Sequence, residues 1–189
     1  MGNCGDVWCF LCIFGTRILI NDVRMRFLGN LEAKIDAKGR AFLPVVFRKV
    51  LQASDEDNLV LRKDVFQSCL VLYPESVWNE QMDTLRSRLS RWNAKHQQIF
   101  RQFVSDVEML TLDGNGRFLI PKRYLKMAGI EQTIKFIGMG DTIEIWSNEN
   151  TDRQLMNTDD FSKALETIMD NSNTANNKKE NPEENIDND

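Results

Sequence analysis

The sequence predicts an α+β fold made of two similar halves, in which short strands alternate with short helices. The stretch "DAKGRAFLP" at residues 36–44 recurs as "DGNGRFLIP" at residues 113–121, with every shared position shifted by 77. Each copy is followed by the same order of helix-like and strand-like segments. Because the period is long and only two copies occur, the repeat suggests a pseudo-symmetric pair of halves rather than a solenoid.

The first half is expected over residues 25–75. Apolar and polar residues alternate over 31–35, which predicts a half-buried strand. A turn follows, because Asp36 can bond the backbone amides ahead of it and Gly39 can adopt positive φ. Pro44 suits the first turn of a helix, "VVFRKVL", since its missing N–H has no helical partner there. Two further strands are predicted at "NLVLRK" and "CLVLYP".

The second half is expected over residues 109–150 and repeats this plan. A lead-in strand precedes a turn from Asp113 to Gly116. Pro121 opens the helix "KRYLKMAG", and the strands "TIKFIGM" and "TIEIWS" follow. The repetition therefore extends beyond the motif to the whole half.

Residues 76–108 are expected to connect the halves as one long or two consecutive amphipathic helices, because apolar residues recur there at three- and four-residue steps. Trp78 and Trp92 are expected to pack against the body of the protein. A basic run in the same segment is more typical of a solvated face or a subunit contact than of a base-reading surface; it comprises Arg86, Arg88 and Arg91.

The two ends of the chain differ in composition from the body. Residues 1–24 form an atypical N-terminal extension, and Met25 is an alternative translation start. Residues 151–170 are expected to contain a C-terminal helix. Residues 171–189 are acidic and rich in Asn, with almost no apolar side chains, so we expect them to be disordered.

The cysteines are expected to be free thiols in a reducing cytoplasm, although the C-x-x-C formed by Cys9 and Cys12 is also compatible with redox chemistry or half of a zinc site. Cys4 lies in the same N-terminal extension. Cys69 lies in an apolar run and is expected to be a small core residue. We therefore expect no metal site.

The overall charge and the motif content exclude several classes of protein. The formal net charge of -4 argues against a uniformly basic nucleic-acid binder. No run of about 18 apolar residues is present, so no membrane span is expected. No histidine lies near Asp36 or Asp113, and no nucleophile elbow, P-loop or zinc-protease motif occurs. We expect a cytoplasmic protein that is not an enzyme and has no cofactor or small-molecule substrate.

The surroundings of the repeated motif are basic, in contrast to the whole chain. Residues 34–49 carry a net charge of +4 and residues 113–126 a net charge of +3. Arg40 and Arg117 follow the turn glycines, and a guanidinium matches both phosphate oxygens and guanine O6 and N7. The alternative is that the same arginines pair with Asp36 and Asp113, and such an ion pair at an exposed site contributes about 0–1 kcal/mol. Chemistry alone leaves both interpretations open.

The motif D-x-x-G-R-x-x-x-P, present twice, resembles the swapped-hairpin DNA-binding domain of the AbrB/SpoVT type. Two such halves, with "LYPESVW" closing the first and "GDTIEIW" near the end of the second, are similar to the MraZ family of transcriptional regulators. The resemblance covers about residues 25 to 160. It implies a pseudo-twofold swapped-hairpin β-barrel with outer helices, assembled into a homo-oligomeric ring.

The resemblance also implies a function and a set of site residues. It implies a nucleoid-associated regulator that binds short repeats in double-stranded DNA upstream of its own division and cell-wall operon and represses that operon. The DNA-binding role transfers to Arg40 and Arg117, with Lys38 as a further basic residue of the first turn. Asn115 replaces this lysine in the second turn, so the halves need not contact DNA equally. The motif-turn residues are Asp36, Gly39, Asp113 and Gly116.

Two alternatives remain open. One is a ring-forming scaffold whose arginine turns are structural and do not read DNA. The other is an enzyme on a related small barrel, such as a self-processing decarboxylase. That enzyme needs a Gly-Ser cleavage site, and no Gly-Ser dipeptide occurs in the chain.

Overall fold

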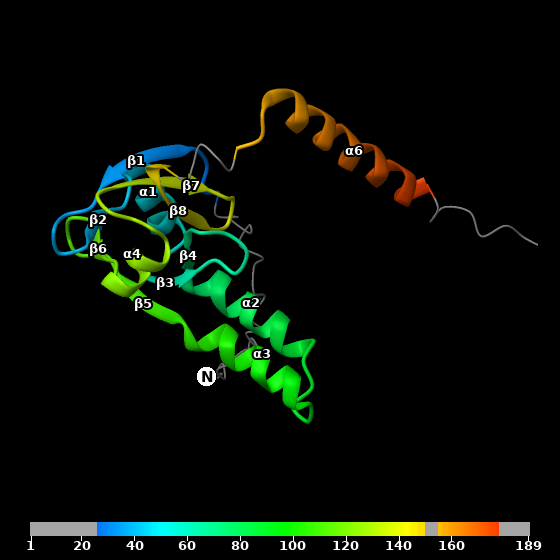
Figure 1. Cartoon of the computed structure of the whole chain (residues 1–189), viewed down its shortest axis with the longest axis horizontal. Helices are drawn as coiled ribbons and strands as arrows, with labels where there is room; N and C mark the ends of the chain where they lie inside the picture. Colours follow the sequence, from blue (N-terminus) through cyan, green and yellow to red (C-terminus); the bar gives the residue numbers. More distant parts are fainter. Residues whose placement is uncertain (1–25, 150–154, 178–189) are drawn as a thin grey trace, which may run out of the picture.

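The computed structural model describes residues 26–149 and 155–177, which form the α+β structure shown in Figure 1. The strands are β1 (Asn30–Lys34), β2 (Arg40–Phe42), β3 (Asn58–Lys63), β4 (Leu70–Pro74), β5 (Val107–Thr111), β6 (Arg117–Leu119), β7 (Thr133–Gly138) and β8 (Ile143–Ser147). The helices are α1 (Val45–Ala53), α2 (Glu75–Ser87), α3 (Ala94–Ser105), α4 (Lys122–Met127) and α6 (Thr158–Asn177).

Six strands form one antiparallel sheet in the order β1-β7-β8-β4-β3-β5, and β2 pairs with β6 as a separate two-stranded ribbon. The order is symmetric with respect to the two halves. Exchanging β1 with β5, β3 with β7 and β4 with β8 gives the same order read backwards. The register obeys the same symmetry, since Ala41 faces Phe118 at the centre of the ribbon and Val71 faces Glu144 at the centre of the sheet.

The strand pairs among the described residues do not join into a closed barrel. The sheet is open, with β1 and β5 at its edges, and the ribbon hydrogen-bonds within itself. Only an isolated bridge between Ile35 and Ala41 links the end of β1 to β2. The ribbon instead covers one face of the sheet, because its inward residues Ala41 and Phe118 belong to the same apolar core as Phe136 of β7.

The main core lies between the sheet, the ribbon and the helices α1 and α4. Alternate residues of each strand point into it, as the two-residue period of a strand requires. Pro44 and Pro121 precede α1 and α4 as their N-caps, which agrees with the expected helix starts. The fully buried side chains of this core include Phe47, Leu61, Leu72, Ile120, Tyr124, Ile134 and Phe136.

The opposite face of the sheet is partly covered by α2 and α3, which extend side by side away from the end that carries the ribbon (Figure 1). Trp78 of α2 stacks on Phe103 of α3 with ring centroids 5.0 Å apart. The buried Arg62 of β3 places its guanidinium 4.3 Å from the Phe103 ring. These contacts attach both helices to the sheet.

The connecting segment is two helices rather than one long helix. The break spans residues 88–93, and α3 begins where the Asn93 side chain accepts a hydrogen bond from the His96 N–H. The expectation that both tryptophans pack is right for Trp78 but wrong for Trp92, which is 97% exposed. Trp92 lies in the break between α2 and α3, where the described residues leave its side chain almost fully exposed.

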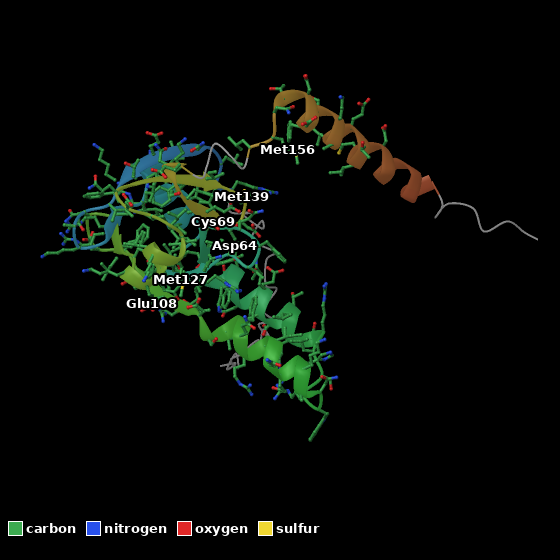
Figure 2. The ribbon with its side chains drawn as sticks, viewed as in Figure 1. Asp64, Cys69, Glu108, Met127, Met139 and Met156 are labelled. Atoms are coloured by element: carbon green, nitrogen blue, oxygen red, sulfur yellow. The ribbon has the colours of Figure 1, made fainter. Side chains whose placement is uncertain are left out.

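Helix α6 stands apart from the sheet in Figure 1, and Figure 2 labels Met156 just before it. The Asn157 side chain caps this helix by accepting the Asp160 N–H at 2.8 Å. The helix continues to Asn177, so residues 171–177 differ from the disordered tail that the composition predicts. Once a helix has formed, each further residue adds one backbone hydrogen bond, so α6 can extend into a segment with few apolar side chains. The amino-acid composition indicates only how much apolar surface that segment can bury.

Other expectations concern single residues or the chain ends. Cys69, labelled in Figure 2, is buried, as expected, and burial raises the pKa of its thiol to about 12. The N-terminal extension with its three cysteines, and residues 178–189, lie outside the described residues. No helix in the described part is both long and apolar enough to cross a membrane.

Candidate nucleic-acid interface

The first repeated turn is organised around the Asp36 carboxylate. Its Oδ1 accepts the backbone N–H groups of Lys38 and Arg40, both at 2.9 Å, and its Oδ2 accepts the Arg40 Nε–H at 2.7 Å. The turn closes when the Gly39 N–H donates to the Asp36 carbonyl at 2.9 Å. One side chain therefore sets both the backbone of the turn and the direction of the arginine.

The second turn repeats this arrangement. The Asp113 Oδ1 accepts the backbone N–H groups of Asn115 and Arg117 at 2.9 Å, and its Oδ2 accepts the Arg117 Nε–H at 2.7 Å. The Gly116 N–H donates to the Asp113 carbonyl at 2.8 Å. The ion pair between aspartate and arginine that the sequence leaves open is thus present in both turns.

Each turn is also tied to the strand that leaves the other turn. The Gly39 carbonyl accepts the Ile120 N–H at 2.9 Å, and the Gly116 carbonyl accepts the Leu43 N–H at 3.0 Å. Both glycines have positive φ, 90° and 78°, and at position 39 a Cβ would lie 2.8 Å from the Ile120 carbonyl oxygen. Glycine is required here for its backbone conformation and for this close approach.

The ribbon brings the two predicted arginines onto one surface. Because Ala41 and Phe118 point into the core, Arg40 and Arg117 point outward from neighbouring strands. Both keep about a third of their side-chain surface exposed, 39% and 31%. The turns lie together at one end of the molecule, at the left of Figure 1. Lys38 is exposed on the first turn, and Asn115 occupies the equivalent exposed position.

The hydrogen bonds within the turns lower the pKa of both aspartates. The largest cause for Asp36 is the backbone N–H of Arg40, and for Asp113 the backbone N–H of Arg117; the arginine side chains act in the same direction. The carboxylates are therefore charged at neutral pH and hold each Arg Nε. Within the described residues, only the Nε of each of these arginines donates a side-chain hydrogen bond, so the Nη groups of Arg40 and Arg117 keep their donors for a ligand.

We expect the double variant Asp36→Asn, Asp113→Asn to melt below the wild type at pH 7, and this difference to shrink in acid. A lowered folded-state pKa stabilises the fold above the ordinary pKa of 3.8, and this contribution is lost as pH falls through the folded-state pKa. Thermal melting of both proteins from pH 7 to about pH 2.5 tests this. A melting difference that stays constant over this range would contradict it.

Arg48 supports the second turn, a role that the sequence does not indicate. Its Nη1 donates to the Asn115 carbonyl at 3.2 Å, and its side chain packs so closely on Gly116 that a Cβ there would collide with it. The equivalent support of the first turn is Leu125, whose Cδ1 would lie 3.6 Å from a Cβ at Gly39. The halves are therefore alike in turn geometry but differ in what lies beneath each turn. The sequence offers one signal for this difference: the offset of 77 places Arg48 and Leu125 at equivalent positions of the two halves.

Replacing Arg48 with leucine is expected to loosen the second turn and leave the first unchanged. The variant loses one hydrogen bond, which contributes about 0.5–1.5 kcal/mol, and gains the residue found at the equivalent position. Hydrogen exchange at the backbone amides of residues 115–117 is expected to accelerate. The amides of residues 38–40 provide the internal control, and equal acceleration in both turns would contradict the assignment.

Further basic residues flank the turns on α1 and α4, including Lys49, Lys122 and Lys126. Arg123 is engaged elsewhere, since its Nη2 lies 3.0 Å from Glu108 Oε2 and also donates to the Tyr124 hydroxyl.

Within residues 26–149 and 155–177, no cluster of His, Cys, Asp and Glu side chains is arranged to hold a metal ion. The chemistry concentrated at the ribbon is therefore that of cationic hydrogen-bond donors.

Comparison with known proteins gives a family match and several similar relatives. A family model described as "MraZ protein, putative antitoxin-like" matches the chain twice, over residues 26–102 and 103–172. The chain is 68% identical over 145 residues to a protein of Phocaeicola vulgatus named transcriptional regulator MraZ, which covers 77% of this chain and 94% of the relative. Proteins with the same name from Bacteroides fragilis and Bacteroides thetaiotaomicron are 61% and 59% identical, over 77% and 79% of this chain and 92% and 96% of the relatives.

Proposed function

Since this chain belongs to the MraZ family, we propose that it is a transcriptional regulator that binds specific double-stranded DNA through Arg40 and Arg117. The observation that carries the proposal is the pair of matching turns, each of which holds an arginine by its Nε on the outer face of one ribbon. The names of the relatives independently support the role of a transcriptional regulator. The proposal assigns no enzymatic activity, cofactor or small-molecule substrate to the chain.

The geometry suggests how the arginines act. An arginine held through Nε presents its two Nη groups as a fork, which matches guanine O6 and N7 or two phosphate oxygens. The aspartate holds the fork in place before DNA arrives, so less side-chain freedom is lost on binding. Lys38 adds a charge beside the first arginine only, and we propose that it contacts the phosphate backbone.

We also propose how the two halves of the chain are arranged. The units are residues 25–75 and 109–150, joined by 76–108 and followed by a C-terminal helical segment, and their interleaved strands form a swapped-hairpin unit. In support, β1 and β5 each pair with a strand of the other half, and each turn glycine bonds the other half. Such an exchange lets one chain complete the fold that would otherwise need two chains.

We further propose that identical subunits assemble into a ring that binds several short repeats upstream of its own operon and represses it. One bidentate contact discriminates between bases by only about 1–3 kcal/mol. Several turns held in one assembly combine such contacts through effective concentration. The expected location is the cytoplasm, on the nucleoid.

The test is a gel-shift of the full chain on DNA from upstream of its own gene, with unrelated DNA of equal length as the control. We expect preferential binding of the upstream DNA, and a steep loss of affinity between about 50 and 200 mM salt, because each phosphate contact releases counterions. Size-exclusion chromatography with light scattering measures the assembly in parallel. Equal binding of both DNAs at all salt concentrations would refute specific recognition, and absence of any shift would favour the scaffold alternative.

A further inference from the structure

The outer face of the ribbon holds two exposed apolar side chains as well as the two arginines. Phe42 and Leu119 lie two residues from Arg40 and Arg117 on the same strands, so all four side chains point away from the core. Phe42 is 55% exposed and Leu119 is 51% exposed. Large apolar side chains at such positions do not stabilise the core that Ala41 and Phe118 occupy.

Each apolar residue lies beside an arginine of the other half. The register pairs Arg40 with Leu119 and Phe42 with Arg117. The Arg117 guanidinium carbon lies 5.7 Å from the centre of the Phe42 ring. The outer face therefore carries two adjacent units, each consisting of one forked donor and one apolar group, related by the internal symmetry of the chain.

We infer that Phe42 and Leu119 contact the 5-methyl groups of thymines in the DNA that this ribbon binds, so that each arginine–apolar pair reads a guanine and a neighbouring thymine. The inference rests on the proposed function. The major groove, about 12 Å wide, admits a two-stranded ribbon. Among the base edges exposed there, the thymine methyl is the apolar group, whereas guanine presents the acceptors that suit arginine. A phosphate backbone offers an apolar side chain no comparable partner.

The test compares DNA with and without the methyl group. The DNA upstream of the gene is amplified with either dTTP or dUTP; the dUTP product carries uracil in place of every thymine that the polymerase incorporates, and base pairing is preserved. Affinities of the full chain for both DNAs are measured by fluorescence anisotropy. The wild type is expected to bind the uracil DNA at least about fourfold more weakly. This is the change in affinity that corresponds to the free energy of burying one methyl group.

Variants assign this preference to the ribbon. The double variant Phe42→Ala, Leu119→Ala is expected to bind thymine and uracil DNA equally. Phe66→Ala is the matched control, because Phe66 is 90% exposed in the connection between β3 and β4, and this variant is expected to keep the wild-type preference. Circular dichroism checks that each variant is folded.

The possible failures are distinguishable. Equal binding of both DNAs by the wild type, with preference over unrelated DNA intact, overturns the inference and leaves the proposed function standing; this arm needs no variant. A preference for thymine DNA that persists in the double variant arises somewhere other than Phe42 and Leu119, and it also overturns the inference. Absence of specific binding by the wild type to thymine DNA removes the proposed function and the inference together.

Discussion

The double variant Arg40→Ala, Arg117→Ala is expected to lose between roughly 30-fold and 20,000-fold in affinity for its specific DNA, because each bidentate arginine contributes about 1–3 kcal/mol of discrimination. Its stability is expected to change little, since each arginine forms an exposed pair with an aspartate, and such pairs contribute about 0–1 kcal/mol. Fluorescence anisotropy and thermal melting measure the two quantities.

The control for this prediction is Arg88→Ala, Arg91→Ala, which removes the same charge from exposed positions in the connection between α2 and α3; this connection lies far from the ribbon in Figure 1. We expect this control to weaken binding only slightly and equally for all DNA. Equal losses in both double variants would mean that charge alone drives binding. Unchanged affinity without Arg40 and Arg117 would support the scaffold alternative.

Lysine at the same two positions separates charge from geometry. Arg40→Lys, Arg117→Lys keeps the charge but replaces the planar fork by a single ammonium group. We expect binding to unrelated DNA to persist while the preference for the upstream DNA falls. A lysine variant with wild-type preference would show that the fork is not what discriminates between sequences.

The second large effect is expected for Trp78→Ala, which should lower the free energy of unfolding by about 3–5 kcal/mol. The variant loses the stack on Phe103 and the edge contact with Tyr73, 5.5 Å between centroids. It also opens a cavity beside the buried guanidinium of Arg62, 5.6 Å from the Trp78 ring. Urea unfolding of the full chain measures the change.

Trp92→Ala makes the same chemical change at a residue that is 97% exposed, so its expected effect is within about 0.5 kcal/mol. Trp78→Phe retains an aromatic ring for the stack and should lie between the two. Similar destabilisation by Trp78→Ala and Trp92→Ala would contradict the buried packing of Trp78 on Phe103. Because α2 and α3 extend away from the ribbon, folded Trp78→Ala protein is expected to keep its DNA affinity.

The two turns were predictable from the sequence because everything that shapes them lies within a few residues. An aspartate can reach amides two and four residues ahead, and a glycine between them supplies the positive φ. The same holds for the helix starts at Pro44 and Pro121 and for the alternation that marks most strands. The duplication itself needed only comparison of residues 36–44 with 113–121.

The tertiary structure alone decided which strands pair, what supports each turn and which aromatic residues pack. The two-residue period of β1 tells which side chains face the core but not that β7, about a hundred residues later, is its neighbour. Arg48 reaches Asn115 across 67 residues, and Trp78 and Trp92 occupy the same connecting segment with opposite exposure. Local chemistry determines turns and faces because its partners are close along the chain. Strand pairing, turn support and burial depend on partners that become neighbours only when the two halves interleave.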